Sequence, residues 1–248
     1  MNIVVCISSV PDTTAKIKFI ENGSKLDTEG VQFVINPYDE FGLTKAMMIK
    51  EKLSAKVTVV TVGNISVEPV IRKALAIGAD EAVRININAK DSYSTATAIA
   101  DYLNSNPADL IITGRESIDY NGGAVGGMLA EILELPFINA CNGLEVSGDT
   151  AELTREIDGG KESISANIPF VIGGQKGLVQ ESELRIPNMR GIMQARTKPL
   201  KVVEPSNNEN LIDSNYFANP AEKGACKLVS SDNVAELVSL LQNEAKVI

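Results

Sequence analysis

The clearest chemical signal in the sequence is a glycine-containing loop that runs from Gly114 to Val125. An apolar run, Leu110 to Thr113, precedes the loop and predicts a buried parallel strand. The apolar residues that follow recur with helical spacing: Val125, Leu129, Ile132 and Leu133. Such a turn leaves backbone N–H groups unpaired at the positive end of a helix, where an anion such as phosphate binds favourably. A tight turn without a ligand is the simpler alternative.

Three further segments are expected to meet this loop at the strand ends. Cys6 to Asp12 follows the first predicted strand, and Val62 to Asn64 follows another. Asn36 to Glu40 begins a helix with Pro37 near its first turn, and its acidic side chains suit the helix dipole. Together these segments would enclose an adenine nucleotide, with main-chain groups for adenine, a carboxylate for ribose and N–H groups for phosphate.

The elements that must position these loops alternate between strand and helix. Apolar runs predict strands at Ile3–Ile7, Val57–Val62, Ala82–Ile85, Leu110–Thr113 and Pro136–Ala140. Apolar residues with helical spacing predict helices between them, over residues 42–53, 67–75, 96–103 and 125–133. The alternation predicts an α/β protein with a doubly wound, mostly parallel, Rossmann-like sheet. In such sheets ligands bind at the carboxyl ends of the strands, near the topological switch point.

The second part of the chain departs from this alternation. Residues 143–172 predict antiparallel strands, because residues 152–157 and 162–168 alternate in polarity around the turn signal Asp158-Gly159-Gly160. Residues 181–219 are expected to be irregular, and the terminal helix has one apolar face, made of Val234, Leu237, Val238 and Leu241. We expect a nucleotide-binding α/β domain over residues 1–185. Residues 186–248 are expected to form a docking loop and a C-terminal arm that ends in a helix and wraps around another chain. The alternative is a terminal helix packed on its own domain.

Composition excludes several kinds of chemistry. The 248 residues include no histidine, which removes Ser-His and Cys-His catalysis and histidine-ligated metals. A formal net charge of -9 and the absence of tryptophan disfavour nucleic acid as a partner. No apolar run is long enough to span a membrane. Three cysteines without motif spacing, and an N-terminus unlike a signal peptide, indicate reduced thiols in a cytoplasm. We expect a binder or carrier, with no catalytic residue of its own, rather than a self-sufficient enzyme.

Several motifs follow one another along nearly the whole chain. They are Val10-Pro11-Asp12, Asn36-Pro37-Tyr38-Asp39-Glu40, the stretch from Ile71 to Asp80, Ile118-Asp119, and the stretch from Arg155 to Glu162 with Ile168-Pro169. In type and order these motifs resemble those of the beta subunit of electron-transfer flavoprotein. The Arg-Glu-Ile-Asp-Gly-Gly hairpin and the Arg-x-Ala-Leu-Ala-x-Gly-Ala-Asp helix are the most specific of them.

The resemblance implies an adenine-nucleotide alpha-hydrolase-like fold and a heterodimer with a larger alpha subunit. It implies an electron carrier between flavin dehydrogenases, such as the acyl-CoA dehydrogenases of fatty acid beta-oxidation, and a quinone reductase or another acceptor. The redox FAD is shared with the alpha subunit and sits mainly on it. The beta subunit holds AMP, the commoner case, or a second FAD in members that bifurcate electrons. The sequence does not decide between AMP and a second FAD.

The resemblance also assigns nucleotide contacts to four segments. They are Cys6; Asn36, Pro37, Tyr38 and Asp39; Val62; and Gly114, Arg115, Glu116, Ser117, Ile118, Asp119, Tyr120, Asn121, Gly122, Gly123, Ala124 and Val125. Asp119 is alternatively a helix cap. The chain departs from the family at Ser8, where a lysine is usual, and at Gly122, Gly123 and Ala124, where side-chain donors to phosphate are usual. Backbone N–H groups or another side chain would have to replace those donors.

The family's dehydrogenase recognition loop falls on about Ile186 to Arg196. The residues implied in docking are Ile186, Pro187, Met189, Arg190, Ile192 and Met193, with Met189 where the family usually has an apolar anchor. Basic residues gather in this part of an acidic chain: Arg185, Arg190, Arg196, Lys198 and Lys201. They form either a solvated loop or a docking surface for an acidic partner.

Two other functions are compatible with the predicted fold. One is a free-standing adenine-nucleotide hydrolase or pyrophosphatase, and the other is a nucleotide-sensing, stress-type module. The hydrolase would need a Ser-Gly-Gly-x-Asp-Ser phosphate loop after the first strand, which the segment from Ser8 to Asp12 does not supply. The sensor, a self-dimer, would not need the long basic arm.

Overall fold

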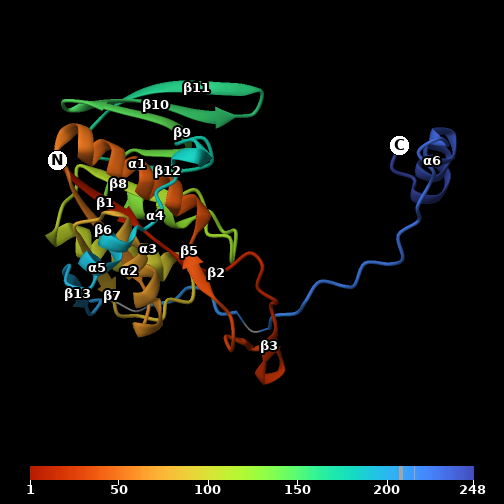
Figure 1. Cartoon of the computed structure of the whole chain (residues 1–248), viewed down its shortest axis with the longest axis horizontal. Coiled ribbons are helices and arrows are strands. Elements are labelled where there is room, and N and C mark those ends of the chain that lie inside the picture. Colours follow the sequence, from red (N-terminus) through yellow and green to blue (C-terminus); the bar gives the residue numbers. More distant parts are fainter. Residues whose placement is uncertain (207–208, 215) are drawn as a thin grey trace.

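The computed structural model describes residues 1–206, 209–214 and 216–248. Within these residues a nine-stranded sheet has the order β11-β10-β9-β12-β8-β1-β6-β7-β13. Its strands are β1 (Asn2–Cys6), β6 (Lys56–Val62), β7 (Glu81–Ile85), β8 (Leu110–Gly114), β9 (Phe137–Ser147), β10 (Thr150–Ile157), β11 (Gly160–Asn167), β12 (Phe170–Gly174) and β13 (Leu200–Val203). Figure 1 shows this sheet as the centre of the body, with helices packed around it. The doubly wound, mostly parallel, Rossmann-like sheet predicted from the sequence is therefore confirmed.

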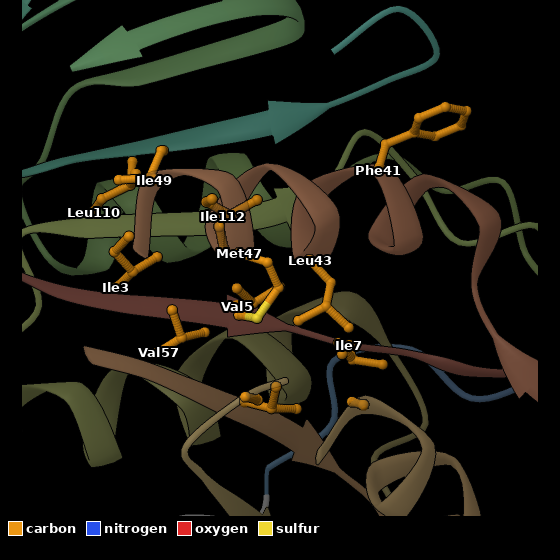
Figure 2. Packing of buried hydrophobic residues seen from close by; sticks show 14 of the residues in the cluster. Ile3, Val5, Ile7, Phe41, Leu43, Met47, Ile49, Val57, Leu110 and Ile112 are labelled. Carbon is orange, nitrogen blue, oxygen red and sulfur yellow. The ribbon is translucent and has the colours of Figure 1, made fainter. Parts of the chain in front are cut away.

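Helices cover both faces of the parallel part of the sheet. They are α1 (Pro37–Leu53), α2 (Glu68–Ile77), α3 (Ser92–Ser105) and α4 (Val125–Ile132). Side chains alternate along β1: Ile3 and Val5 pack in the cluster that includes α1 and α2, whereas Val4 and Cys6 pack with α3 and α4. Figure 2 shows Leu43 of α1 directed toward the end of β1. Because both faces are covered, the central strands are continuous apolar runs, which is why their positions could be predicted.

The strand order reverses direction at the centre of the sheet. From β1 the chain passes through α1 to β6 and through α2 to β7, each parallel and one position further out. After α3 the chain returns to the other side of β1, where β8 pairs with it in parallel. The switch point therefore lies between β1 and β8, and the carboxyl ends of these two strands flank the crevice where this class of sheet binds ligands.

The antiparallel hairpin is confirmed, but the predicted antiparallel region extends too far. Strands β10 and β11 pair antiparallel around the turn at Asp158 and Gly159, as expected. Strand β12 instead pairs in parallel with both β8 and β9, so the prediction of antiparallel structure to Ile172 is wrong there. All five residues of β12 are buried, and a strand inside the sheet has no exposed face to produce alternating polarity.

The segment predicted as irregular, residues 181–219, contains regular elements. A 3₁₀ turn, η3 (Glu181–Glu183), is followed by helix α5 (Met189–Ala195), and β13 then adds an edge strand parallel to β7. Helix α5 has seven residues and β13 has four, too few for their periodicity to be recognised in the sequence. The docking segment is therefore part of the α/β body, and the arm begins after Val203.

Two small antiparallel pairs project from the body after β1. They are β2 (Ser9–Pro11) with β5 (Phe33–Ile35), and β3 (Phe19–Ile20) with β4 (Lys25–Leu26), which is joined to β3 by the 3₁₀ turn η1 (Glu21–Gly23). A further 3₁₀ turn, η2 (Ile65–Val67), precedes α2. The ring of Phe19 stacks on that of Phe217, with centroids 5.6 Å apart, so this projection holds the start of the arm.

The C-terminal arm leads away from the sheet to a terminal helix, α6 (Val234–Leu240), continued by the π-helical turn η4 (Leu241–Ala245) (Figure 1). The root of the arm is anchored, because the Oδ2 atom of Asp91 accepts hydrogen bonds from the N–H groups of Leu211 (2.6 Å) and Ile212 (2.8 Å). Beyond the root, Val234 and Leu237 on the apolar face of α6 are exposed. The chain thus has the predicted arm that ends in a helix, and the helix lies away from its own sheet. That the arm wraps around another chain stays a prediction.

Candidate functional site

The strand ends at the switch point are bordered first by the start of α1, and the space beside them is the candidate crevice. The Oδ2 atom of Asp39 accepts a hydrogen bond from the N–H of Ser8 at 2.7 Å, and the carbonyl of Ser8 accepts one from the N–H of Asn36 at 3.0 Å. The loop after β1 is therefore bound to the first turn of α1. Pro37, in that turn, fits the position because its missing N–H would have no partner inside the helix.

Asn36 ties the same turn to the loop after β8. Its side-chain amide donates to the carbonyl of Glu116 at 2.8 Å and accepts from the N–H of Ile118 at 3.2 Å. Gly114 allows the end of β8 to lie close to the start of α1, because a Cβ on this residue would lie only 2.2 Å from Oδ1 of Asp39. Three segments that are far apart in the sequence are thus joined at the carboxyl ends of β1 and β8.

Asp39 is almost completely buried, with 3% of its surface exposed. Burial raises the pKa of this carboxyl from 3.8 to about 7, against the opposing effect of the hydrogen bonds from Ser8, Asn36 and Gly114. Burial also raises the pKa of the nearby Cys6 thiol to about 12, so Cys6 is an inert thiol that packs in the core. Asp39 and Asn36 therefore hold the loops of the crevice together.

The raised pKa of Asp39 predicts a pH-dependent stability. The folded protein holds a proton that the unfolded chain releases above pH 3.8, so the contribution of Asp39 to stability is lost as the pH rises toward 7. The loss is at most about 1.4 kcal/mol per pH unit in that window. The test is urea unfolding of the unchanged protein and of Asp39→Asn at several pH values. Between pH 4 and 7 the free energy of unfolding is expected to fall for the unchanged protein relative to that of Asp39→Asn. Parallel pH profiles would contradict the assignment.

The loop from Ser117 to Ala124 is open to solvent and is shaped by its own contacts. The hydroxyl of Ser117 donates to Oδ1 of Asp119 at 2.5 Å, and the N–H of Tyr120 donates to the same oxygen at 2.9 Å. Asn121 and Gly123 have φ values of 51° and 58°, a left-handed backbone that asparagine and glycine adopt most easily. Asp119 thus organises this loop, rather than capping α4.

Helix α4 begins at the end of this loop without a side-chain cap in the described part of the chain. A Cβ on Gly126, in its first turn, would lie 2.7 Å from Oγ1 of Thr113, so this turn packs directly on β8. Its first N–H groups are therefore available to a ligand. Gly122 leaves the adjoining space open, because a Cβ there would meet only the hydroxyl of Ser92, 3.7 Å away, at the start of α3. The loop after β8 thus offers backbone donors beside a positive helix end.

The remaining predicted nucleotide residues lie around the same strand ends. Val62 ends β6, the neighbour of β1 on the side opposite β8. Arg115 follows β8, and its guanidinium approaches Oε1 of Gln175 at 3.4 Å. The buried Gln175 in turn donates to Glu156 of β10 at 2.8 Å. This link from the loop to the hairpin has no signal in the sequence, because neither Gln175 nor Glu156 belongs to a periodic pattern.

The predicted docking residues lie on α5 and in the loop just before it. Ile186, Met189 and Met193 are 85%, 75% and 67% exposed, and α5 packs against α2. Pro187 and Ile192 line a groove between these two helices, with a volume of about 530 Å³. Arg190 is exposed. The apolar side chains of this segment therefore form a protruding patch, in which Ile186 is more exposed than the predicted anchor, Met189.

The sheet, its switch point and the loops that meet there define a Rossmann-like, doubly wound α/β protein of the kind that binds ligands at strand ends. In the described residues no helix has the length and apolar character to cross a bilayer. A family model described as "Electron transfer flavoprotein domain" matches residues 24–208.

Three relatives are similar over nearly their whole length, and each is an electron transfer flavoprotein subunit beta. The Bacillus subtilis protein is 37% identical over 262 residues, covering 100% of both chains. The Syntrophomonas wolfei protein is 33% identical, covering 100% of this chain and 98% of its own. The Dictyostelium discoideum protein is 30% identical, covering 95% and 96%. The chain belongs to the electron transfer flavoprotein beta-subunit family.

Proposed function

We propose that this chain is the beta subunit of a heterodimeric electron carrier, paired with a larger alpha subunit that holds most of the shared FAD. The complex would take electrons from a flavin dehydrogenase, such as an acyl-CoA dehydrogenase, and pass them to a downstream acceptor. Membership of the family supports the carrier role. The free thiols of Cys6, Cys141 and Cys226 agree with a reducing cytoplasm as the compartment.

We further propose that the crevice holds an adenine nucleotide, either AMP or a second FAD. The observation that carries this proposal is the uncapped start of α4 beside Gly122 and Gly123, at the switch point of the sheet. Phosphate would be held by backbone N–H groups of the loop and of the first turn of α4. An AMP adds no redox centre, whereas a second FAD would add one and permit bifurcation of electrons.

The usual side-chain donors to phosphate are absent at Gly122, Gly123 and Ala124, and the hydroxyl of Ser92 is the nearest side-chain replacement beside Gly122. The side chains of Asp39 and Asn36 would not bind the nucleotide. They would hold the surrounding loops in place through hydrogen bonds of 2.7–3.2 Å. This division of roles fits the burial of both residues. Tyr38 and Val62 would line the crevice.

The arm is proposed to bind the alpha subunit through the apolar face of α6. That face includes Leu237 and Val238, which are exposed while the root of the arm is anchored at Asp91. An apolar face of this kind is stable in water only when another surface covers it. The anchored root would aim the arm at the alpha subunit.

Co-expression with the alpha subunit tests this assembly. Leu237→Asp places a charge on the apolar face and is expected to reduce the co-purified alpha subunit at least about tenfold, since buried apolar anchors contribute roughly 2 kcal/mol or more to binding. Ser239→Asp is the matched control, because it adds the same charge to the same helix at an exposed polar residue. Equal, undiminished recovery of the alpha subunit with both variants would contradict the role of α6. A chain that is stable alone and recovers no flavin-bearing partner on co-expression would contradict the carrier function itself.

A further inference from the structure

Helix α5, which carries the proposed docking side chains, is too short to be stable by itself. It has seven residues, and of these only Ala195 is buried. Isolated helices of fewer than about 12 residues are marginal in water. Its exposed apolar side chains, Met189 and Met193 among them, cannot hold it on the body. Specific contacts to α2 must therefore fix its position.

The main contact comes from Arg72 of α2. Its Nη1 atom donates hydrogen bonds to the carbonyl of Ala195 at 2.7 Å and to the carbonyl of Lys198 at 3.0 Å. Ala195 is the last residue of α5, where the helix dipole is negative and a cation is stabilising, and Lys198 lies three residues beyond it. The guanidinium is partly buried, so these hydrogen bonds are less screened by water than a surface contact.

Lys198 makes the reciprocal contact. Its Nζ atom donates to the carbonyl of Leu75 at 2.9 Å and to that of Ala79 at 2.6 Å, at the end of α2. Each of the two helices thus has its last carbonyls bound by a cation from the other segment. A close backbone approach adds to this clamp, because a Cβ on Gly191 would lie 2.2 Å from the carbonyl oxygen of Ala76.

We propose that Arg72 is a positioning residue for docking: by holding the end of α5 on α2, it presents Ile186, Met189 and Met193 as one rigid apolar patch. This inference rests on the docking role proposed above for that segment. A partner would otherwise have to order a mobile segment on binding, which costs affinity but leaves the electron-transfer step itself unaffected. Arg72 is not expected to touch the partner or the flavin.

Arg72→Gln in the assembled complex tests the proposal by two measurements. The first is limited digestion with trypsin, followed at Arg190 and Arg196, two exposed arginines of the segment. Cleavage there is expected to accelerate about tenfold or more, because proteolysis follows the population of the opened segment. The second is the reduction of the complex by the dehydrogenase, in which the KM for the complex is expected to rise about tenfold while kcat stays within about twofold.

The control is Arg155→Gln, which removes a different arginine, one whose partner Glu162 lies 2.5 Å away on the hairpin. It is expected to change neither measurement. Unchanged cleavage and unchanged KM in Arg72→Gln would overturn the proposal. Faster cleavage with unchanged KM would reject the docking role of the segment and, with it, the inference. If Arg72→Gln does not yield folded protein, Lys198→Gln, which removes the reciprocal hydrogen bonds, is tested by the same two measurements.

Discussion

Replacing Gly123 by glutamate is expected to empty the proposed nucleotide site of the assembled complex. Gly123 lies two residues before the start of α4, and a Cβ there would lie 3.6 Å from the nearest atom, the carbonyl oxygen of Arg115. The new carboxylate would therefore fit, but it would stand where the phosphate of the nucleotide is proposed to bind. Two unit charges about 4 Å apart repel by roughly 4 kcal/mol at an effective dielectric constant of 20. That energy corresponds to about a thousandfold weaker binding.

The backbone at this position requires a matched control. Gly123 has a φ of 58°, and residues other than glycine, asparagine and aspartate adopt this left-handed backbone conformation only with strain. Gly123→Asn keeps this backbone accessible and adds no charge, as the neighbouring Asn121 does at a φ of 51°. Nucleotide released by acid and separated by chromatography is expected at close to the normal amount from Gly123→Asn and to be nearly absent from Gly123→Glu. Full occupancy in the glutamate variant would contradict the placement of the phosphate.

The second large effect is expected at the docking patch. Ile186→Asp puts a carboxylate on the most exposed apolar side chain of the segment, 85% exposed, and Met189→Asp does the same at 75%. Either charge would have to be buried unpaired against the dehydrogenase. Because anchor residues of interfaces contribute roughly 2 kcal/mol or more, the KM for the complex as electron acceptor is expected to rise at least about thirtyfold. The flavin content of the complex is expected to stay unchanged.

Gln194→Asp separates the loss of an apolar anchor from the addition of a charge. Gln194 is exposed on α5, the helix that carries Met189, so its replacement adds an equal charge without removing an apolar side chain. We expect near-normal reduction of this variant by the dehydrogenase. Normal turnover of both Ile186→Asp and Met189→Asp would show that another surface docks the dehydrogenase. A loss confined to one of them would identify the anchor. The resemblance to the family places this anchor at Met189, whereas the greater exposed fraction favours Ile186.

Much of the fold could be predicted because its central elements have strong patterns. The stripe of Val70, Ile71, Ala74 and Leu75, with Gly78 after it, predicted α2 and its end. Strand β12 was predicted with the wrong pairing, since a fully buried strand such as Phe170–Gly174 carries no signal for its direction. Helix α5 is held by hydrogen bonds that involve Arg72 and Lys198, and β13 by pairing with β7, and the sequence gives no sign of such distant partners.

The candidate site was predictable in its location but less so in its division of roles. The glycines of the loop after β8 and the proline at the start of α1 indicated where segments would meet. From the sequence, Asp39 was an acidic residue suited to the dipole of α1, and the resemblance placed it among the nucleotide contacts. In the structure this carboxylate accepts the N–H of Ser8, a contact that depends on how three separate loops pack. A buried acid and an exposed one look the same in a sequence, so this role could emerge only from the fold.

The most direct test of the central claim is the number of nucleotides in the assembled complex. The unchanged chain is co-expressed with its alpha subunit, the heterodimer is purified, and its adenine nucleotides are released by acid and separated by chromatography. Two adenine nucleotides per heterodimer are expected: the shared FAD and one further nucleotide bound by this chain, either AMP or a second FAD. A heterodimer with the shared FAD alone would contradict the proposal that the crevice between β1 and β8 is a nucleotide site.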